Sequence, residues 1–324
     1  MKVILPLAGL GTRMRPHTWS KPKPLLSIAG KPVLGHILDK LASLGIEEVV
    51  FIIGWLGDQI EAYVEAQYDF KTRYVVQEEL RGQAHALYLA RESLSGPCLI
   101  IFVDTLFEAD LTDLESSDAD VVAFVQEVED PRRFGVAVQE GGRVVRLIEK
   151  PDTLEHRDAV VGIYYIREGA ELVRAIEYLL ENNIQTRGEF YLTDAIQVMI
   201  DRGAHVIARQ VDVWEDCGQP DAVLKTHRYL LDTGHTNEIA VQNGVVIPPV
   251  HIAPSARIES AVVGPYVSVG ENVVIRDAIV RDSIIEAGCT VEGVVLEGSL
   301  LGRNARITSS PKGLNVGDDD EIAL

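Results

Sequence analysis

Residues 7–26 read LAGLGTRMRPHTWSKPKPLL, a glycine-rich segment that begins where a short apolar run, residues 2–7, ends. Gly9 and Gly11 let the backbone approach a ligand closely and point N–H groups at it. Four cations lie within eleven residues: Arg13, Arg15, Lys21 and Lys23. Since no acidic residue occurs between positions 1 and 37, the segment is locally basic. Cations beside such a backbone nest indicate a site for a polyphosphate.

The spacing of this segment differs from two common phosphate-binding motifs. A P-loop requires Gly-Lys-Ser/Thr after four intervening residues, and that pattern is missing. The dinucleotide motif Gly-x-Gly-x-x-Gly requires a third glycine, but Arg13 and Met14 are followed by Arg15. A Walker ATPase and a dinucleotide dehydrogenase are therefore both disfavoured. Gly-x-Gly on its own is also compatible with a plain tight turn.

Strand and helix patterns alternate over the first 110 residues. Residues 32–44 carry a helical apolar stripe closed by Gly45, and CLIIFV at residues 98–103 is typical of a buried strand. Repeated units of this kind predict a parallel sheet covered by helices, with ligands at the carboxyl ends of the strands. Asp104, directly after CLIIFV, falls at such an end. Beyond residue 118 the order of strands and helices is more mixed, and this α/β domain is expected to cover residues 1–233.

The pattern changes near residue 245. From residue 246 to 307, helix signals give way to short aliphatic-centred units that repeat about every six residues. This period predicts a parallel β-helix of about three coils, at ~18 residues each, over residues 246–308. An antiparallel sheet of short strands is the alternative. Residues 234–245 are expected to form a linker, and residues 309–324 an acidic flexible tail.

Composition limits the classes of partner. The chain has 324 residues, of which 47% are hydrophobic and 24% charged, and its net charge is -19. This charge argues against a nucleic-acid partner, because phosphate backbones are bound by clustered Lys and Arg. No apolar run reaches the ~18 residues of a membrane helix, and the start lacks the features of a signal peptide. Cys98, Cys217 and Cys289 are far apart and match no zinc spacing, which favours a reducing cytoplasm.

The glycine-rich segment resembles the signature of the sugar-1-phosphate nucleotidylyltransferases. The resemblance rests on residues 8–13 (AGLGTR), on Pro16-x-Thr18 and on residues 22–25 (PKPL), and it extends to residues 216–218 (DCG). It implies a Rossmann-like domain with a mixed, mainly parallel sheet, followed here by a short left-handed parallel β-helix. It also implies Mg²⁺ as cofactor, and a nucleoside triphosphate and a sugar 1-phosphate as substrates.

The resemblance assigns a role to each matching residue. The expected catalytic residues are Arg13, which grips the departing pyrophosphate, Lys23, which bridges the two substrates, and Asp104. The expected metal ligands are Asp104 and Asp216. The expected nucleotide-binding residues are Leu7, Ala8, Gly9, Gly11, Thr12, Arg13, Gln77 and Gly82, with Gln77 and Gly82 reading the base. The expected sugar-phosphate-binding residues are Gly135, Glu149, Lys150 and Gly162. Arg15 either adds to the pyrophosphate grip or is solvated, and Thr193 or Asp194 is either near the site or an N-cap.

Several alternatives concern substrate and role. Glucose 1-phosphate with dTTP or UTP is favoured over a mannose-1-phosphate guanylyltransferase-like activity. A non-catalytic nucleotide-sugar-binding paralogue is disfavoured, because such a protein is expected to lose a metal carboxylate or a phosphate cation. Acyl transfer by the β-helix is also disfavoured, since His251 is the only histidine near the repeat. We expect the β-helix to join copies of the chain in a homo-oligomer.

Overall fold

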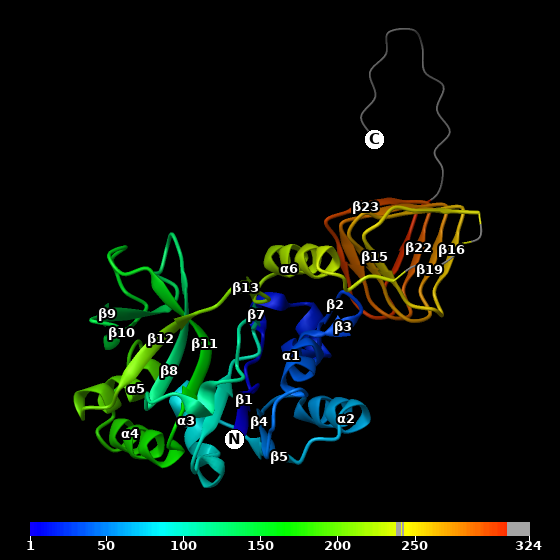
Figure 1. Cartoon of the computed structure of the whole chain (residues 1–324). Helices are drawn as coiled ribbons and strands as arrows, with labels where there is room; N and C mark the ends of the chain where they lie inside the picture. Colours follow the sequence, from blue (N-terminus) through cyan, green and yellow to red (C-terminus); the bar gives the residue numbers. More distant parts are fainter. Residues whose placement is uncertain (238–240, 242, 310–324) are drawn as a thin grey trace. The chain divides into compact units, whose positions relative to one another are not determined.

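The computed structural model describes residues 1–237, 241 and 243–309, which form two compact units (Figure 1). The first unit comprises residues 1–26 and 31–226, and the second comprises residues 27–30 and the described residues from His227 onwards. The expected tail, apart from its first residue, lies outside the described residues. Every helix within the described residues is too short or too polar to cross a membrane.

The first unit contains most of the regular structure. Its strands are β1 (Lys2–Pro6), β3 (Lys31–Pro32), β4 (Glu48–Ile53), β5 (Thr72–Val76), β6 (Cys98–Ile101), β7 (Thr105–Glu108), β8 (Val121–Glu127), β9 (Gly135–Glu140), β10 (Arg143–Glu149), β11 (Asp158–Ile166), β12 (Val206–Gln210) and β13 (Val213–Asp216). Its helices are α1 (Val33–Leu41), α2 (Gly57–Gln67), α3 (Gln83–Leu89), α4 (Gly169–Glu181) and α5 (Leu192–Asp201). Short 3-10 turns cover Thr12–Met14, His17–Trp19, Lys23–Leu25, Arg91–Ser93 and Leu114–Ser116.

Nine strands of the first unit form one mixed sheet. Its main path runs β10-β9-β11-β6-β1-β4-β5, and β8 pairs with β11 and β12. Strands β6, β1, β4 and β5 are mutually parallel. Every residue of β4 and β6 is buried, as expected for parallel strands covered on both faces. The predicted Rossmann-like class with a mixed, mainly parallel sheet is confirmed.

The other half of the sheet is largely antiparallel. Strand β11 pairs antiparallel with β6, β8 and β9, and β10 pairs antiparallel with β9. The pairing of β11 with β8 shifts register between Val160 and Tyr164. Gly162 lies inside this shift with φ +83°, a conformation that favours glycine. Side chains of α3, α4 and α5 share one apolar core with these strands.

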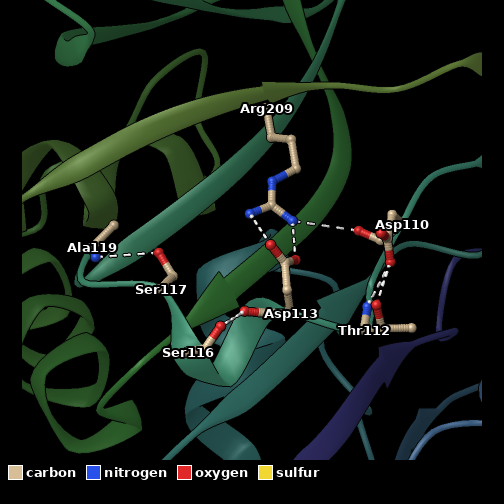
Figure 2. Close-up of polar contacts among 7 residues, drawn as sticks. All are labelled: Asp110, Thr112, Asp113, Ser116, Ser117, Ala119 and Arg209. Atoms are coloured by element: carbon tan, nitrogen blue, oxygen red, sulfur yellow. Dashed lines mark hydrogen bonds and ion pairs between the residues drawn. The ribbon is translucent and has the colours of Figure 1, made fainter.

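An ion pair ties the loop between β7 and β8 to β12. Arg209 donates from both terminal nitrogens to the Asp113 carboxylate, at 2.6 and 3.3 Å, and Nη1 also lies 3.5 Å from the Asp110 carbonyl (Figure 2). Asp110 in turn accepts hydrogen bonds from the backbone and hydroxyl of Thr112. Because both partners are partly exposed, this pair contributes at most about 1 kcal/mol.

The second unit is a three-sided parallel β-helix preceded by helical residues. Helix α6 (Pro220–Asp232) runs across the boundary between the two units. The remaining strands are β2 (Ser27–Ile28), β14 (Val245–Val246), β15 (Val250–Ile252), β16 (Arg257–Glu259), β17 (Val262–Val263), β18 (Val267–Val269), β19 (Val274–Arg276), β20 (Ile279–Arg281), β21 (Ser283–Ile285), β22 (Thr290–Glu292), β23 (Val295–Glu297), β24 (Leu300–Leu301) and β25 (Arg306–Thr308).

Three parallel four-stranded sheets form its sides: β14-β17-β20-β23, β15-β18-β21-β24 and β16-β19-β22-β25. The layers are visible in Figure 1 as stacked strands. Along the first side, Val245 pairs with Val262, Ile279 and then Val295, which are offsets of 17, 17 and 16 residues. The coils are thus slightly shorter than the ~18 residues expected for such repeats, and four layers form instead of three. The handedness of the β-helix stays a prediction.

The second unit includes a short piece of chain from near the amino terminus. The backbone N–H of Ala29 donates to Nδ1 of the buried His227, at 3.2 Å. A Cβ on Gly30 would lie 2.0 Å from Nε2 of His251. These packing contacts explain why residues 27–30 belong to this unit. The division therefore differs from a single boundary at residue 233.

Gly264 is where a side chain would disturb the β-helix most directly. It has φ +109°, and a Cβ there would lie 1.9 Å from the carbonyl oxygen of Ile247. We expect Gly264→Ala to lower the free energy of unfolding by about 3 kcal/mol or more, since backbone strain and a backbone clash add. Gly298 has φ +58° with no heavy atom within 4 Å of the Cβ position. Gly298→Ala should cost only about 1–2 kcal/mol. If chemical denaturation showed the same loss of unfolding free energy for Gly264→Ala and Gly298→Ala, this account would be contradicted.

Candidate active site

A cavity of about 520 Å³ opens beside the carboxyl ends of β1 and β6. Its lining includes all eight residues expected to bind the nucleotide: Leu7, Ala8, Gly9, Gly11, Thr12, Arg13, Gln77 and Gly82. Lys23 and Asp104 also line it. Glu189 also lines it, as do Leu80, Gln83 and Phe102, to which the sequence assigned no role. The positions of these last three residues depend on tertiary packing, for which the local sequence gave no signal.

The glycine-rich segment folds back on itself at the cavity. Gly11 adopts φ +59°, and its carbonyl accepts a hydrogen bond from the Thr18 hydroxyl at 2.8 Å. A Cβ on Gly11 would lie 3.0 Å from the Lys23 Cβ. The turn therefore brings the start of the segment against Lys23, although twelve positions separate them in the chain. The Arg15 guanidinium instead lies over the Trp19 ring, 4.0 Å from the ring centroid. Arg15 is not one of the residues that line the cavity.

Two candidate metal ligands come from adjacent strands. Strands β7 and β13 pair antiparallel with Thr105 opposite Asp216, and the Cys217 N–H donates to the Asp104 carbonyl at 2.9 Å. Asp104 and Asp216 are therefore neighbours across this pair, although more than one hundred residues separate them in sequence. The sequence patterns did not predict β7 or β13, because four residues are too few for a clear periodicity.

Cations lie next to these carboxylates. Lys23 Nζ is 3.8 Å from Asp104 Oδ2, and the Asp104 side chain is 51% exposed. Asp216 Oδ1 accepts a hydrogen bond from the Gly218 N–H at 2.6 Å. A Cβ on Gly218 would lie 3.3 Å from Arg13 Nη2, so Arg13 also reaches this point. Arg13, Lys23 and Asp104 thus line the cavity, whereas Asp216 does not line it but is hydrogen-bonded to the lining residue Gly218.

The donor set fits a magnesium ion. Mg²⁺ prefers hard oxygen ligands and is usually bound by one or two carboxylates together with phosphate and water oxygens. Asp104 and Asp216 supply such carboxylates beside an open cavity. Within the described part of the chain no group of three or more His, Cys, Asp or Glu side chains could hold a metal. A dedicated protein cage for a structural metal is therefore absent from that part.

Gln77 and Gly82 also line the cavity. Gln77 is buried, and its backbone N–H donates to the Ile53 carbonyl at 2.8 Å. Gly82 has φ +108°, and a Cβ there would lie 2.5 Å from the Phe190 carbonyl oxygen. Glycine is therefore required at this point. The buried amide of Gln77 offers both a donor and an acceptor, as reading the edge of a base requires.

The cavity lining includes none of the four residues expected to bind the sugar phosphate. Gly135, Glu149 and Lys150 form a separate polar cluster in the same unit. Gly162 lies beside the cavity instead, because its carbonyl accepts a hydrogen bond from the N–H of the lining residue Phe102 at 2.9 Å. A Cβ on Gly135 would lie 3.0 Å from Glu149 Oε2. Lys150 Nζ is 3.5 Å from Glu149 Oε1.

Glu149 is the central acid of this cluster. Burial raises the pKa of its carboxyl group, and the Thr193 hydrogen bond and the Lys150 charge act in the opposite direction. The Thr193 hydroxyl donates to Glu149 Oε2 at 2.9 Å. Thr193 and Asp194 are not the N-cap of α5, because that position is Tyr191. Thr193 therefore belongs to the polar cluster.

Comparison with known proteins identifies the class. The model of the nucleotidyl transferase family matches residues 2–233. A glucose-1-phosphate thymidylyltransferase from Streptomyces griseus is 31% identical over 96% of this chain and 95% of its own. The chain therefore belongs to the nucleotidyl transferase family and is an enzyme of that class. Its relatives with curated names place it among the sugar-1-phosphate nucleotidylyltransferases.

Other similarities agree with this assignment. A UTP–glucose-1-phosphate uridylyltransferase, AglF of Haloferax volcanii, is 30% identical over 68% of this chain and 93% of its own. A crystal structure of UDP-glucose pyrophosphorylase complexed with UDP-glucose has a TM-score of 0.61 at 22% identity. It covers 72% of this chain and 98% of that one. This last likeness supports the fold alone.

Gly9 provides a test of whether the cavity holds the nucleotide. No heavy atom lies within 4 Å of the position of a Cβ on Gly9, and its φ is ordinary, so Gly9→Ala should leave the unfolding free energy within about 0.5 kcal/mol of wild type. The added methyl group enters the space where the backbone would meet a phosphate. We expect the KM for the nucleotide to rise about tenfold or more, measured by pyrophosphate release.

Gly45 is the matched control, since it also has open space around its Cβ position but lies outside the cavity. Gly45→Ala should change neither KM nor stability appreciably. An unchanged nucleotide KM in Gly9→Ala would argue against a nucleotide at this loop.

Proposed function

We propose that this enzyme joins glucose 1-phosphate to the nucleotidyl group of dTTP or UTP and releases pyrophosphate. The proposal is carried by one observation: Arg13, Lys23 and Asp104 line one cavity together with the glycine-rich loop, and Asp216 lies next to Asp104 across the pair of β7 and β13. The names of the relatives, thymidylyltransferase and uridylyltransferase of glucose 1-phosphate, support these two nucleotides. A guanylyltransferase acting on mannose 1-phosphate is the alternative.

In this proposal, a phosphate oxygen of the sugar phosphate attacks the α-phosphorus of the nucleotide. A new P–O bond forms as the bond from the α-phosphorus to the bridging oxygen breaks, and pyrophosphate leaves with that oxygen. Both reactants are anions, so the barrier is largely electrostatic. Arg13 would neutralise the departing pyrophosphate, and Lys23 would hold the nucleotide and sugar phosphates together. Mg²⁺ held by Asp104 and Asp216 would supply further charge neutralisation.

The remaining residues would bind and orient the substrates. Backbone N–H groups of the glycine-rich loop would hold phosphate oxygens, and Gln77 with Gly82 would read the base. Glu149 would accept hydrogen bonds from sugar hydroxyls, and Lys150 would bind the sugar phosphate. Gly135 and Gly162 would allow close approach of the backbone to the sugar.

Loss of one metal carboxylate tests the mechanism. We expect Asp104→Asn to lower kcat for pyrophosphate release by a factor of about 100 or more, because a neutral amide holds Mg²⁺ poorly and leaves charge unscreened. The assay pairs each nucleoside triphosphate with a panel of sugar 1-phosphates at saturating Mg²⁺. Turnover restricted to GTP with mannose 1-phosphate would favour the alternative.

Asp113→Asn is the matched control, since Asp113 is an exposed aspartate of the same unit that pairs with Arg209 (Figure 2). Its turnover should stay within about twofold of wild type. Equal pyrophosphate release by wild type and Asp104→Asn would refute the assignment of Asp104.

We further propose that the β-helix joins copies of this chain. One of its sides presents an outward row of aliphatic side chains in register: Val245, Val262, Ile279 and Val295. Val245 and Val295 are 54% and 63% exposed. At the edge of this row, Arg281 lies opposite Glu297 in the register of β20 and β23, so this edge carries charges of both signs. The three free, buried cysteines are compatible with the proposed cytoplasmic location.

Val295→Glu should convert an oligomer into a monomer in light scattering at micromolar concentration, because it places a charge in the aliphatic row. Val274→Glu is its control, on the outward face of a different side. A monomeric wild-type protein, or equal effects of the two substitutions, would contradict assembly through this row.

A further inference from the structure

The Lys150 side chain is partly buried and is held by several contacts. Its Nζ donates a hydrogen bond to the Tyr191 hydroxyl and lies 4.2 Å from the centroid of the Tyr191 ring, over the ring face. The same Nζ is 3.5 Å from Glu149 Oε1. Tyr191 itself is only 6% exposed, so its ring is fixed by packing. A flexible lysine side chain therefore lies against a rigid partner.

The backbone of Lys150 is also constrained. Its φ of +46° lies in the left-handed region, which a residue with a side chain rarely adopts. Such a conformation persists when surrounding contacts enforce it. Here the Lys150 N–H donates to the Phe134 carbonyl at 2.9 Å, and its carbonyl accepts from Arg187 Nη2 at 3.1 Å. Contacts within the chain thus hold both the backbone and the side chain of Lys150 in place.

The ammonium group stays charged in this setting. Burial acts to lower the pKa of Lys150, but the hydrogen bond to Tyr191 and the Glu149 charge outweigh it, so the pKa is raised. The Tyr191 hydroxyl accepts one of the three ammonium protons. At least one other proton remains available for a phosphate oxygen.

Tyr191 belongs to a segment that contacts both halves of the site. Glu189 lines the cavity, and Phe190 exchanges backbone hydrogen bonds with Arg81 and Ala84, at 3.0 and 2.9 Å, around Gly82. Two positions beyond Tyr191, Thr193 donates to Glu149. One short stretch therefore touches the base side and the sugar side of the site.

We infer that Tyr191 is a positioning residue for the sugar phosphate: its hydroxyl and ring hold the Lys150 ammonium in the orientation that meets the phosphate of the sugar 1-phosphate. The inference rests on the proposed function, because it takes Lys150 as the ligand of that phosphate. Its physical basis is preorganisation. A free lysine loses rotamer freedom when it binds, and a lysine already fixed by Tyr191 loses less.

The test removes the Tyr191 hydroxyl and keeps the aromatic ring. Tyr191→Phe should raise the KM for glucose 1-phosphate about tenfold, the usual effect of losing a hydrogen bond to a charged group. The KM for the nucleotide and kcat should change less than twofold, as measured by pyrophosphate release with each substrate varied in turn. Tyr191→Leu also removes the ring face and should raise the same KM by a further few-fold.

Three companion variants separate positioning from general structure. Tyr178→Phe alters a matched tyrosine, over which Arg202 lies 5.2 Å from the ring centroid outside the cavity, and should leave both KM values unchanged. Lys150→Ala should raise the glucose 1-phosphate KM more than Tyr191→Phe does. In the Lys150→Ala background, Tyr191→Phe should have no further effect, because its only target is gone.

The outcomes distinguish the two levels of the proposal. If Lys150→Ala leaves the glucose 1-phosphate KM unchanged, the role of Lys150 in the proposed function is wrong, and the inference about Tyr191 fails with it. If Lys150→Ala raises this KM but Tyr191→Phe behaves as wild type, only the inference is overturned. A Tyr191→Phe variant that raises the KM of both substrates equally, or acts fully in the Lys150→Ala background, also overturns it.

Discussion

The candidate active site depends on a two-stranded antiparallel pair, β7 with β13. This pair places Asp104 beside Asp216 and fixes both next to Lys23 and Arg13. A tight, buried ion pair between Lys23 and Asp104 would leave neither charge available to a ligand. Instead, Lys23 and Asp104 lie 3.8 Å apart, and the aspartate is half exposed. Charge therefore remains available to ligands, as a reaction between two anions requires.

A second constraint is that residues 189–193 contact both Gly82, which lines the cavity, and Glu149 of the polar cluster. Gly82 fits against Phe190 because it lacks a side chain, and Glu149 is held by Thr193. A displacement of this segment would alter both contacts together. The expected site residues thus lie on several strand ends, and the segment that leads into α5 contacts two groups of them. In the proposed function, this shared segment would align the two substrates with each other.

Two predictions rest on local signals in the sequence. The regular six-residue period predicted the β-helix, which is confirmed, and the dense cluster of glycines and cations predicted a phosphate site, which stays a prediction. The sequence also predicted Asp104 from its place after a buried strand. It did not predict β7 and β13, whose four-residue length carries no periodicity, or the contact of Tyr191 with Lys150. That contact joins residues 41 positions apart, and only the folded chain brings them together.

The membership of residues 27–30 in the β-helix unit has a consequence for how the protein can be divided. These residues follow Lys23 by only a few positions, and their packing partners include His227 and His251. A gene fragment ending before residue 227 would encode every candidate catalytic group yet leave this short piece of chain without its partners. Such a cut would therefore leave the Ala29 N–H without the imidazole that accepts from it and would remove the His251 ring that packs against Gly30.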